Sequence, residues 1–219
     1  MASQKIGFVT VDPVSGSGDQ AVNFSGEKHT GRLQRTINLT VTTNGGAKKA
    51  LVVNQAAAAE VVRSDSPNAS VQKTGGNVTI TGKSNSTKLT FAVTPAEENG
   101  LTLQLPANYT AAGKTTANGA VIADDPGAAG EFVWSITISD VPANVTIEEL
   151  TATLKVTAAG GQIANVTVTQ AAGNSTIELD KETINLDVNG TQQTVNVTSN
   201  DSWTWAQAAA RTVLRMMGR

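Results

Sequence analysis

One stretch of this sequence occurs twice, 115 residues apart and without a gap, and that repeat constrains the fold most. Residues 39–46 and 51–57 correspond to residues 154–161 and 166–172. In both copies apolar residues alternate with polar ones on either side of a Gly-Gly pair. Alternation with a period of two is typical of half-buried strands, and glycine supplies the positive φ that a tight turn needs. The repeat therefore predicts a β-hairpin that closes each of several tandem domains.

A second repeated pattern marks where a domain starts. It consists of three short alternating segments, each predicted to be a strand, with turn residues between them. The first set covers residues 69–71, 77–80 and 88–91, and the second covers residues 177–179, 184–186 and 195–197.

Together the two patterns predict one complete domain at residues 64–172. Within it we expect strands near residues 101–105 and 131–139, separated by a loop at residues 107–130 that is rich in Ala, Gly and Thr. Loops of this length are uncommon in compact domains and often carry contacts.

The remaining residues predict two incomplete domains. Residues 1–63 contain the closing hairpin without clear starting strands, and residues 173–219 contain starting strands without the hairpin. Half of a sandwich exposes an apolar face and free strand edges. Pairing residues 1–57 with residues 173–203, within one chain or between chains, would cover both, so we expect a homo-oligomer or strand exchange with a neighbour.

Composition agrees with an all-β chain of tandem immunoglobulin-like sandwiches. Aromatic residues make up 4% of the 219 residues, so the cores must be built mainly from Val, Ile, Leu and Ala. There is no cysteine, which excludes disulfides, thiolate metal ligands and cysteine nucleophiles. The 16 basic and 18 acidic residues produce no strong field, so nucleic acid is not an expected partner. The first residues lack the apolar core of a signal peptide, and no apolar run is long enough for a membrane span.

Short motifs near both ends carry a family resemblance. They occupy residues 11–13, 15–18, 29–32, 35–36, 39–42 and 53–55, and later residues 177–179 and 195–203, which include Ser-Asn-Asp-Ser-Trp. The first group resembles the second half of a BACON-type immunoglobulin-like domain, and the second group resembles its first half. The composition is also similar to that of auxiliary capsid or head-decoration proteins of crAss-like Bacteroides phages.

Residues that could carry chemistry are few. His29 is the only histidine and has no Cys or second His as a partner, so a His-based triad or a metal site is not expected. The sequence Gly113-Lys114-Thr115 is similar to the end of a phosphate-binding loop, but Asn108 occupies the place of its first glycine. The acidic pairs at residues 97–98, 124–125 and 148–149 are predicted to be solvated turns, because adjacent strand residues face opposite ways. We predict no catalytic residue, cofactor or metal.

Three aromatic residues are candidates for partner contacts. Trp203 and Trp205 are two apart and would share one face of a strand. They either stack on sugar rings or pack in a core or interface, and both alternatives stay open. Tyr109, on the predicted long loop, is the third candidate.

The C-terminal residues predict a short amphipathic helix. Ala210, Val213, Leu214 and Met217 form an apolar stripe, and Arg211, Arg215 and Arg219 form a basic one. A helix this short is marginal alone and is expected to dock on its own sandwich or in a partner groove. Membrane binding is not expected.

The resemblance implies a non-enzymatic structural virion protein, made in the host cytoplasm, that decorates a capsid. Its partners would be the major capsid protein or other virion proteins. The alternative is a carbohydrate-binding immunoglobulin-like module of a Bacteroidetes surface or phage adhesion protein.

Overall fold

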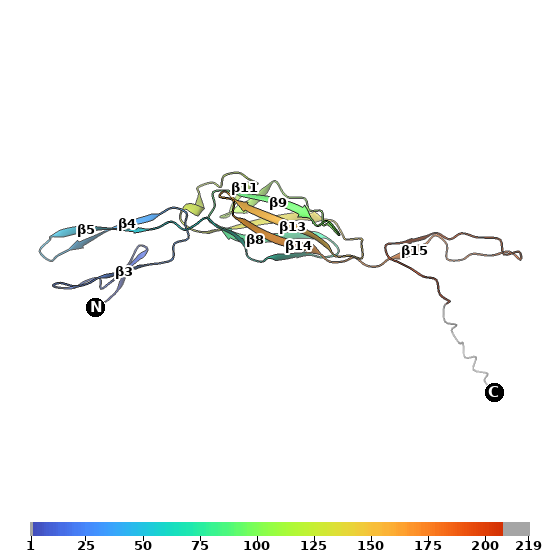
Figure 1. The fold of residues 1–219 in the computed structure, drawn as a ribbon, viewed down its shortest axis with the longest axis horizontal. Helices are drawn as coiled ribbons and strands as arrows, with labels where there is room; N and C mark the ends of the chain where they lie inside the picture. Colours follow the sequence, from blue (N-terminus) through green and yellow to red (C-terminus); the bar gives the residue numbers. More distant parts are fainter. Residues whose placement is uncertain (1, 208–219) are drawn as a thin grey trace, which may run out of the picture.

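The computed structural model describes residues 2–207, which form an elongated all-β molecule (Figure 1). A two-sheet sandwich lies in the middle, and smaller sheets extend from both of its ends. The prediction of an all-β fold is confirmed. Among the described residues, the only helical element is a single 3-10 turn, η1 (Pro126–Ala128).

The central sandwich has one sheet in the order β11-β10-β12-β8-β6 and another in the order β7-β14-β13-β9. Neighbouring strands are antiparallel, except that β7 pairs with β14 in parallel. Two sheets over a shared core are the arrangement of an immunoglobulin-like sandwich. The strands are β6 (Val62–Ser64), β7 (Asn68–Val71), β8 (Gly76–Ser84), β9 (Leu89–Pro95), β10 (Asn108–Ala111), β11 (Lys114–Ala117), β12 (Phe132–Val141), β13 (Leu150–Ala158) and β14 (Ile163–Gln170).

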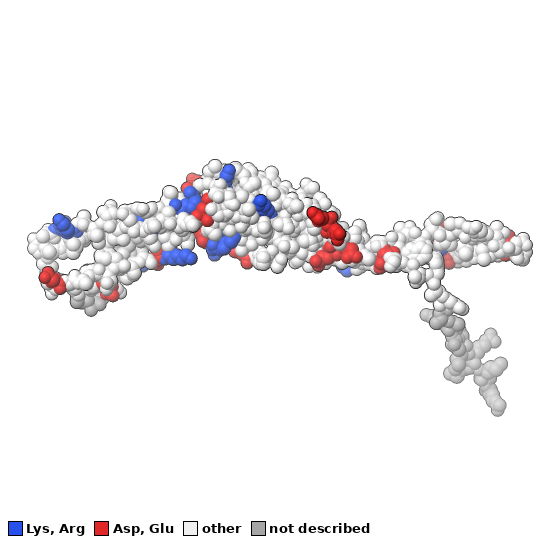
Figure 2. Space-filling model, in the orientation of Figure 1, with Lys and Arg blue, Asp and Glu red and all other residues white. Residues whose placement is uncertain are grey.

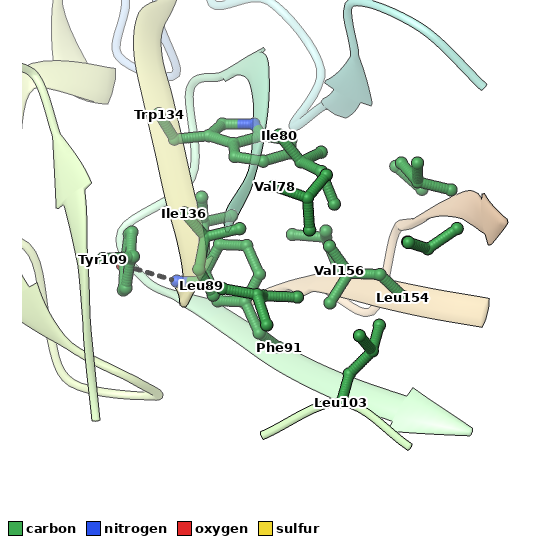
Figure 3. Close-up of a cluster of buried hydrophobic side chains, with 14 of the residues drawn as sticks. Val78, Ile80, Leu89, Phe91, Leu103, Tyr109, Trp134, Ile136, Leu154 and Val156 are labelled. Carbon is green, nitrogen blue, oxygen red and sulfur yellow. Dashed lines mark hydrogen bonds between the residues drawn. The ribbon is translucent and has the colours of Figure 1, made fainter. Parts of the chain in front are cut away.

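The core of this sandwich contains four aromatic side chains among many aliphatic ones, and three of the four pack on one another (Figure 3). The ring of Phe91 lies 5.6 Å from that of Trp134 and 4.8 Å from that of Tyr109, measured between centroids. Trp134 is fully buried, and Gly82 on the neighbouring strand leaves room for its indole. Inward-facing residues alternate with outward ones along β12 and β13, and for β13 the sequence predicted this alternation.

Two sequence predictions for the sandwich are wrong. Residues 107–130 are not one irregular loop, because β10 and β11 form a hairpin that turns at Ala112 and Gly113, both with positive φ. Residues 101–105 do not form a strand, although Leu101 and Leu103 are buried in the core. Their apolar residues pack from a segment without regular secondary structure instead.

The N-terminal segment contains two small sheets. The first has the order β1-β2-β3 (Gln4–Ile6, Val9–Asp12 and Asn23–Gly26), and the second is the hairpin of β4 (Arg35–Thr42) and β5 (Lys48–Gln55). The hairpin confirms the prediction from the Gly-Gly repeat, and its register repeats that of β13 and β14 after 115 residues: Leu39 pairs with Leu51 as Leu154 pairs with Val166. The three strands before the hairpin had no clear sequence pattern.

The C-terminal segment pairs only two short strands, β15 (Ile177–Leu179) and β16 (Val197–Ser199). They repeat the register of β6 and β8, because Ile177 pairs with Ser199 as Val62 pairs with Ser84. The strand predicted at residues 184–186 is not formed.

The junctions at both ends of the sandwich repeat the same hydrogen bonds. Asn85 accepts one from the amide of Val61 and donates to the carbonyl oxygens of Ala59 and Thr30, at 2.8–2.9 Å. Asn200, 115 residues later, makes the equivalent three bonds to Thr176, Asn174 and Val145, each at 2.8 Å. The repeat therefore includes the way in which one unit is joined to the next.

Candidate protein-interaction surfaces

The two sheets of the N-terminal segment enclose an open apolar groove of about 300 Å³. We call this groove the N-terminal face. Its walls come from β1 to β3 on one side and from β4 and β5 on the other. It is lined by Ile6, Val11, Pro13, Val14, Val22, Phe24, Leu39, Thr40, Val41 and Leu51.

The apolar residues that β4 and β5 contribute to the N-terminal face occupy positions that are fully buried in the central sandwich. Val41 is 69% exposed, whereas Val156, its counterpart in the repeat, is 0% exposed. Leu51 is 44% exposed, and its counterpart Val166 is 0% exposed. In the sandwich these positions lie in the sheet β7-β14-β13-β9 and face the other sheet, β11-β10-β12-β8-β6, across the core. The N-terminal segment has no equivalents of β6 to β9, so these side chains meet solvent.

The described part of the C-terminal segment lacks the strands of the other half of the sandwich, so it also exposes apolar residues. We call its exposed apolar residues the C-terminal face; they are Ile177, Leu179, Ile184, Leu186, Val188, Trp203 and Trp205. Ile177 and Leu186 are 58% and 59% exposed, whereas their counterparts Val62 and Val71 are buried. This segment contains the counterparts of β6 and of the end of β8, and it has no equivalents of β12 to β14.

Polar contacts hold the C-terminal segment in its extended form. The carboxylate of Asp180 accepts hydrogen bonds from the backbone amide and the side-chain amide of Asn196, at 2.8 and 2.7 Å. The backbone bond is the main reason why the pKa of Asp180 lies below its usual range. Asp187 accepts hydrogen bonds from Thr191 across the turn at Gly190, and these lower its pKa as well. The face is therefore held open by local bonds rather than by a core.

Trp203 and Trp205 lie together on the C-terminal face. Their ring centroids are 5.9 Å apart and the ring planes are nearly perpendicular, at 83°. With Ile177, Leu179 and Thr204 they line a shallow hollow of about 280 Å³. The two rings make an edge-to-face pair that is 45% and 68% exposed, not a flat shared platform on a strand.

The N-terminal and C-terminal faces lie at opposite ends of the molecule (Figure 1). Among the described residues, no strand of the N-terminal segment pairs with a strand of the C-terminal segment, so the predicted pairing of residues 1–57 with residues 173–203 is not formed within one chain. Each end keeps its own apolar face and its own free strand edges.

The prediction that Tyr109 is an exposed contact residue is wrong. Its side chain is 3% exposed in β10, where its ring packs on Phe91. The hydroxyl accepts a hydrogen bond from the amide of Leu89 at 3.3 Å (Figure 3). Burial raises the pKa of this phenol. The alternation of Tyr109 with Ala111, both buried, was the missed sign of a strand.

The predicted C-terminal helix and most of its contact residues lie outside the described residues. They are Arg211, Val213, Leu214, Arg215 and Met217. The described residues immediately before them, 203–207, have no regular secondary structure.

The remaining polar candidates serve the fold. His29 lies within hydrogen-bonding distance of the carbonyl oxygen of Leu33, 2.6 Å from its Nε2. Gly113 forms the β10-β11 turn, so the segment that resembled a phosphate loop is a hairpin tip. Asp124 pairs with Lys114, and Asp125 pairs with Arg32 across the junction to the N-terminal segment.

The described residues contain no cluster of three or more potential metal-binding side chains. Within residues 2–207 no helix is long and apolar enough to cross a membrane.

A comparison with protein families places most of the chain in one of them. A model of the Toastrack DUF4097 family matches residues 34–206, from β4 through the central sandwich to the second tryptophan of the C-terminal face. No curated protein matches the chain. The family match agrees with the β-rich fold that the sequence resemblance implied. It gives no evidence for a relationship to BACON-type domains or to phage proteins. Because it extends over well more than half of the residues, the chain belongs to the Toastrack DUF4097 family.

Proposed function

We propose that this protein is a structural component that acts through protein–protein contacts and catalyses no reaction. The observation that carries the proposal is the pair of open apolar faces at opposite ends of a closed sandwich. Exposed apolar surface next to free strand edges is typical of an interaction site. A rigid sandwich between two such surfaces suits a connector.

The distribution of polar residues supports a non-catalytic role. The chain has a single histidine, and its imidazole contacts a backbone carbonyl oxygen rather than a carboxylate. The ion pairs of Lys5 with Glu27 and of Lys114 with Asp124 are exposed. Catalysis would need ionisable groups that converge in a cleft.

The place of action that we propose is a virion, where the chain would decorate a capsid. This proposal rests on the sequence resemblance to auxiliary capsid proteins. Purified chain mixed with purified capsids should co-sediment with them, and it should stay in the supernatant when capsids are left out. Failure to co-sediment would overturn the virion placement and leave the contact role to be tested on other partners.

A second candidate function is carbohydrate binding, and the exposed Trp203–Trp205 pair favours it. Exposed indoles bind sugars by stacking, but a perpendicular pair offers only one ring at a time to a flat sugar face. Glycan-array binding that disappears in Trp205→Ala would support this function. Equal binding by Trp205→Ala and the unaltered chain, or no binding by either, would reject it.

A further inference from the structure

We propose that copies of this chain join head to tail, so that the C-terminal face of one copy completes the open sandwich of the N-terminal face of the next. This proposal rests on the proposed contact function and names a second copy as the partner. Both faces include positions whose counterparts the central sandwich buries in one core. Val156 is the counterpart of Val41 on the N-terminal face, and Val62 is the counterpart of Ile177 on the C-terminal face. In the central sandwich Val156 and Val62 belong to the same core.

The central sandwich shows how the first strand would add. In it β7 pairs in parallel with β14, and Val168 lies opposite Ala69. The equivalent residues, 115 positions away, are Val53 on β5 and Ile184 on the C-terminal face. Residues 183–186 of one copy would therefore form a parallel strand along the free edge of β5 in the next. This is β-strand addition, in which main-chain hydrogen bonds supply affinity and side chains supply register.

An unfinished hydrogen-bond pattern at Gln55 supports this register. In the central sandwich the Gln170 side chain donates to the carbonyl oxygens of Pro142 and Gln72, at 2.7 and 3.3 Å. Gln55 makes only the first of the two equivalent bonds, to Glu27 at 2.8 Å. The acceptor of the second would be the carbonyl of Asp187, which lies in the C-terminal segment. A second copy would supply it.

The other sheet offers a matching edge. β3 is an edge strand of the sheet β1-β2-β3. Its residues 23–26 lie 115 positions before residues 138–141, which are the end of β12. In the central sandwich β12 pairs with β8 along almost its whole length. The C-terminal segment contains the counterpart of β8 at residues 191–199. The missing strands of both sheets are thus present in one segment.

Charge also favours contact between unlike ends. Residues 2–57 carry six basic and three acidic side chains, whereas residues 173–207 carry one basic and five acidic. Figure 2 shows acidic side chains gathered at the end of the sandwich from which the C-terminal segment leaves. Opposite net charges steer an N-terminal segment toward a C-terminal one, and like charges disfavour contact between two identical faces.

A head-to-tail contact between faces at opposite ends does not close on two copies. Such heterologous contacts give rings when the rotation between copies closes and open chains when it does not. The repeated junctions at Asn85 and Asn200 would then recur along the whole assembly. The product is a series of sandwiches in which every second one is built from two chains.

The test is the mass of the chain in solution, with one variant that blocks each face. Val41→Asp places a charge on the N-terminal face, and Leu186→Asp places one on the C-terminal face. Both side chains are exposed in the single chain, at 69% and 59%, so the central sandwich should remain folded. Val121→Asp, in a loop of the sandwich and 72% exposed, is the matched control.

We expect the unaltered chain and the Val121→Asp control to form oligomers whose mass, measured by light scattering, rises with concentration. Each blocked variant alone should be monomeric, with half-assembly moved to an about 100-fold higher concentration or beyond. An equimolar mixture of the two blocked variants should form a dimer of one copy of each, because each retains the face that the other needs. A circular-dichroism melt confirms that every variant is folded.

Two results would overturn the proposal. One is a monomeric unaltered chain at all concentrations, and the other is a mixture of blocked variants that stays monomeric while the unaltered chain assembles. Neither result tests binding to capsids. Failure of self-association is therefore measured by light scattering, and failure of the proposed function is measured separately by co-sedimentation with capsids.

Discussion

The central sandwich and the two terminal segments contain the same repeated strands in different surroundings. Leu154 and Val156 of β13 are fully buried, whereas Val41, at the equivalent place in β4, is 69% exposed. The hairpin register is the same in both regions. Local sequence therefore determines the hairpin, and burial depends on whether the strands of the opposite half are present.

This difference separates two sources of stability. A hairpin gains backbone hydrogen bonds and cross-strand contacts from residues close in sequence. A core gains apolar burial, at about 25 cal/mol per Å², from residues far apart in sequence. The terminal segments have the first and little of the second, so substitutions at equivalent positions should have very unequal effects.

The largest difference is expected at Gly82 and its counterpart Val197. A Cβ at Gly82 would overlap the carbonyl oxygen of Arg63 and the indole of Trp134. We expect Gly82→Val to lower the free energy of unfolding by about 3 kcal/mol, because a packed core does not absorb added volume. The reverse change, Val197→Gly, should cost no more than about 1 kcal/mol. Urea unfolding at low protein concentration measures both, and equal costs would show that the two regions are packed alike.

Val156 and Val41 give the next comparison with identical chemistry. Val156→Ala removes two buried methyl groups and should cost about 2 kcal/mol, from lost burial and the cavity left behind. Val41→Ala in dilute protein should cost less than about 0.5 kcal/mol, because the side chain already meets solvent. If the copies associate, the cost of Val41→Ala should grow with protein concentration in the same urea experiment. A cost near 2 kcal/mol in dilute protein would mean that the N-terminal face is covered within one chain.

Sequence patterns predicted those elements whose signals are local. The hairpins at residues 39–53 and 154–168 followed from alternation and the Gly-Gly turn. The segments at residues 69–71, 77–80 and 88–91 were predicted to be strands for the same reason, and they form β7, part of β8 and the beginning of β9. The fold class followed from their repetition.

The failures concern positions where distant contacts decide. Tyr109 was predicted to lie on an exposed loop because the surrounding Gly, Ala and Thr residues give no clear strand pattern for the short hairpin β10-β11. Its burial follows from contacts with Phe91 and Leu89, which lie far from it in the sequence. The segment at residues 184–186 has a strand pattern, yet no neighbouring strand is present for it to pair with. The exposed faces could be inferred from the half-domain pattern, but their positions at opposite ends could not.

The junction asparagines allow a smaller and more specific test. Asn85 is fully buried and makes three hydrogen bonds, so Asn85→Ala would leave the amide of Val61 and two carbonyl groups without partners. We expect a loss of about 2 kcal/mol. Asn200→Ala breaks the equivalent bonds where water can replace them, and it should cost less than about 1 kcal/mol. Hydrogen exchange at the amides of Val61 and Thr176 reports on each junction separately. An equal increase in the hydrogen-exchange rates of the two amides would contradict the prediction that the buried junction at Asn85 loses more stability.

The smallest expected effect is a pH dependence that belongs to the closed sandwich. Arg63 on β6 donates hydrogen bonds to Glu131, which precedes β12, and these hold the pKa of the Glu131 carboxyl below its usual value. A carboxyl whose pKa is lower in the folded state adds stability above its unfolded pKa, and this stability disappears as the pH falls through the folded pKa. Because the pair is partly exposed, we expect a contribution of only about 0.5 kcal/mol. Glu131→Gln should therefore reduce stability at pH 7 by this amount and leave it almost unchanged at pH 3. An equal loss at both pH values in urea titrations would assign the effect to packing of the side chain instead of its charge.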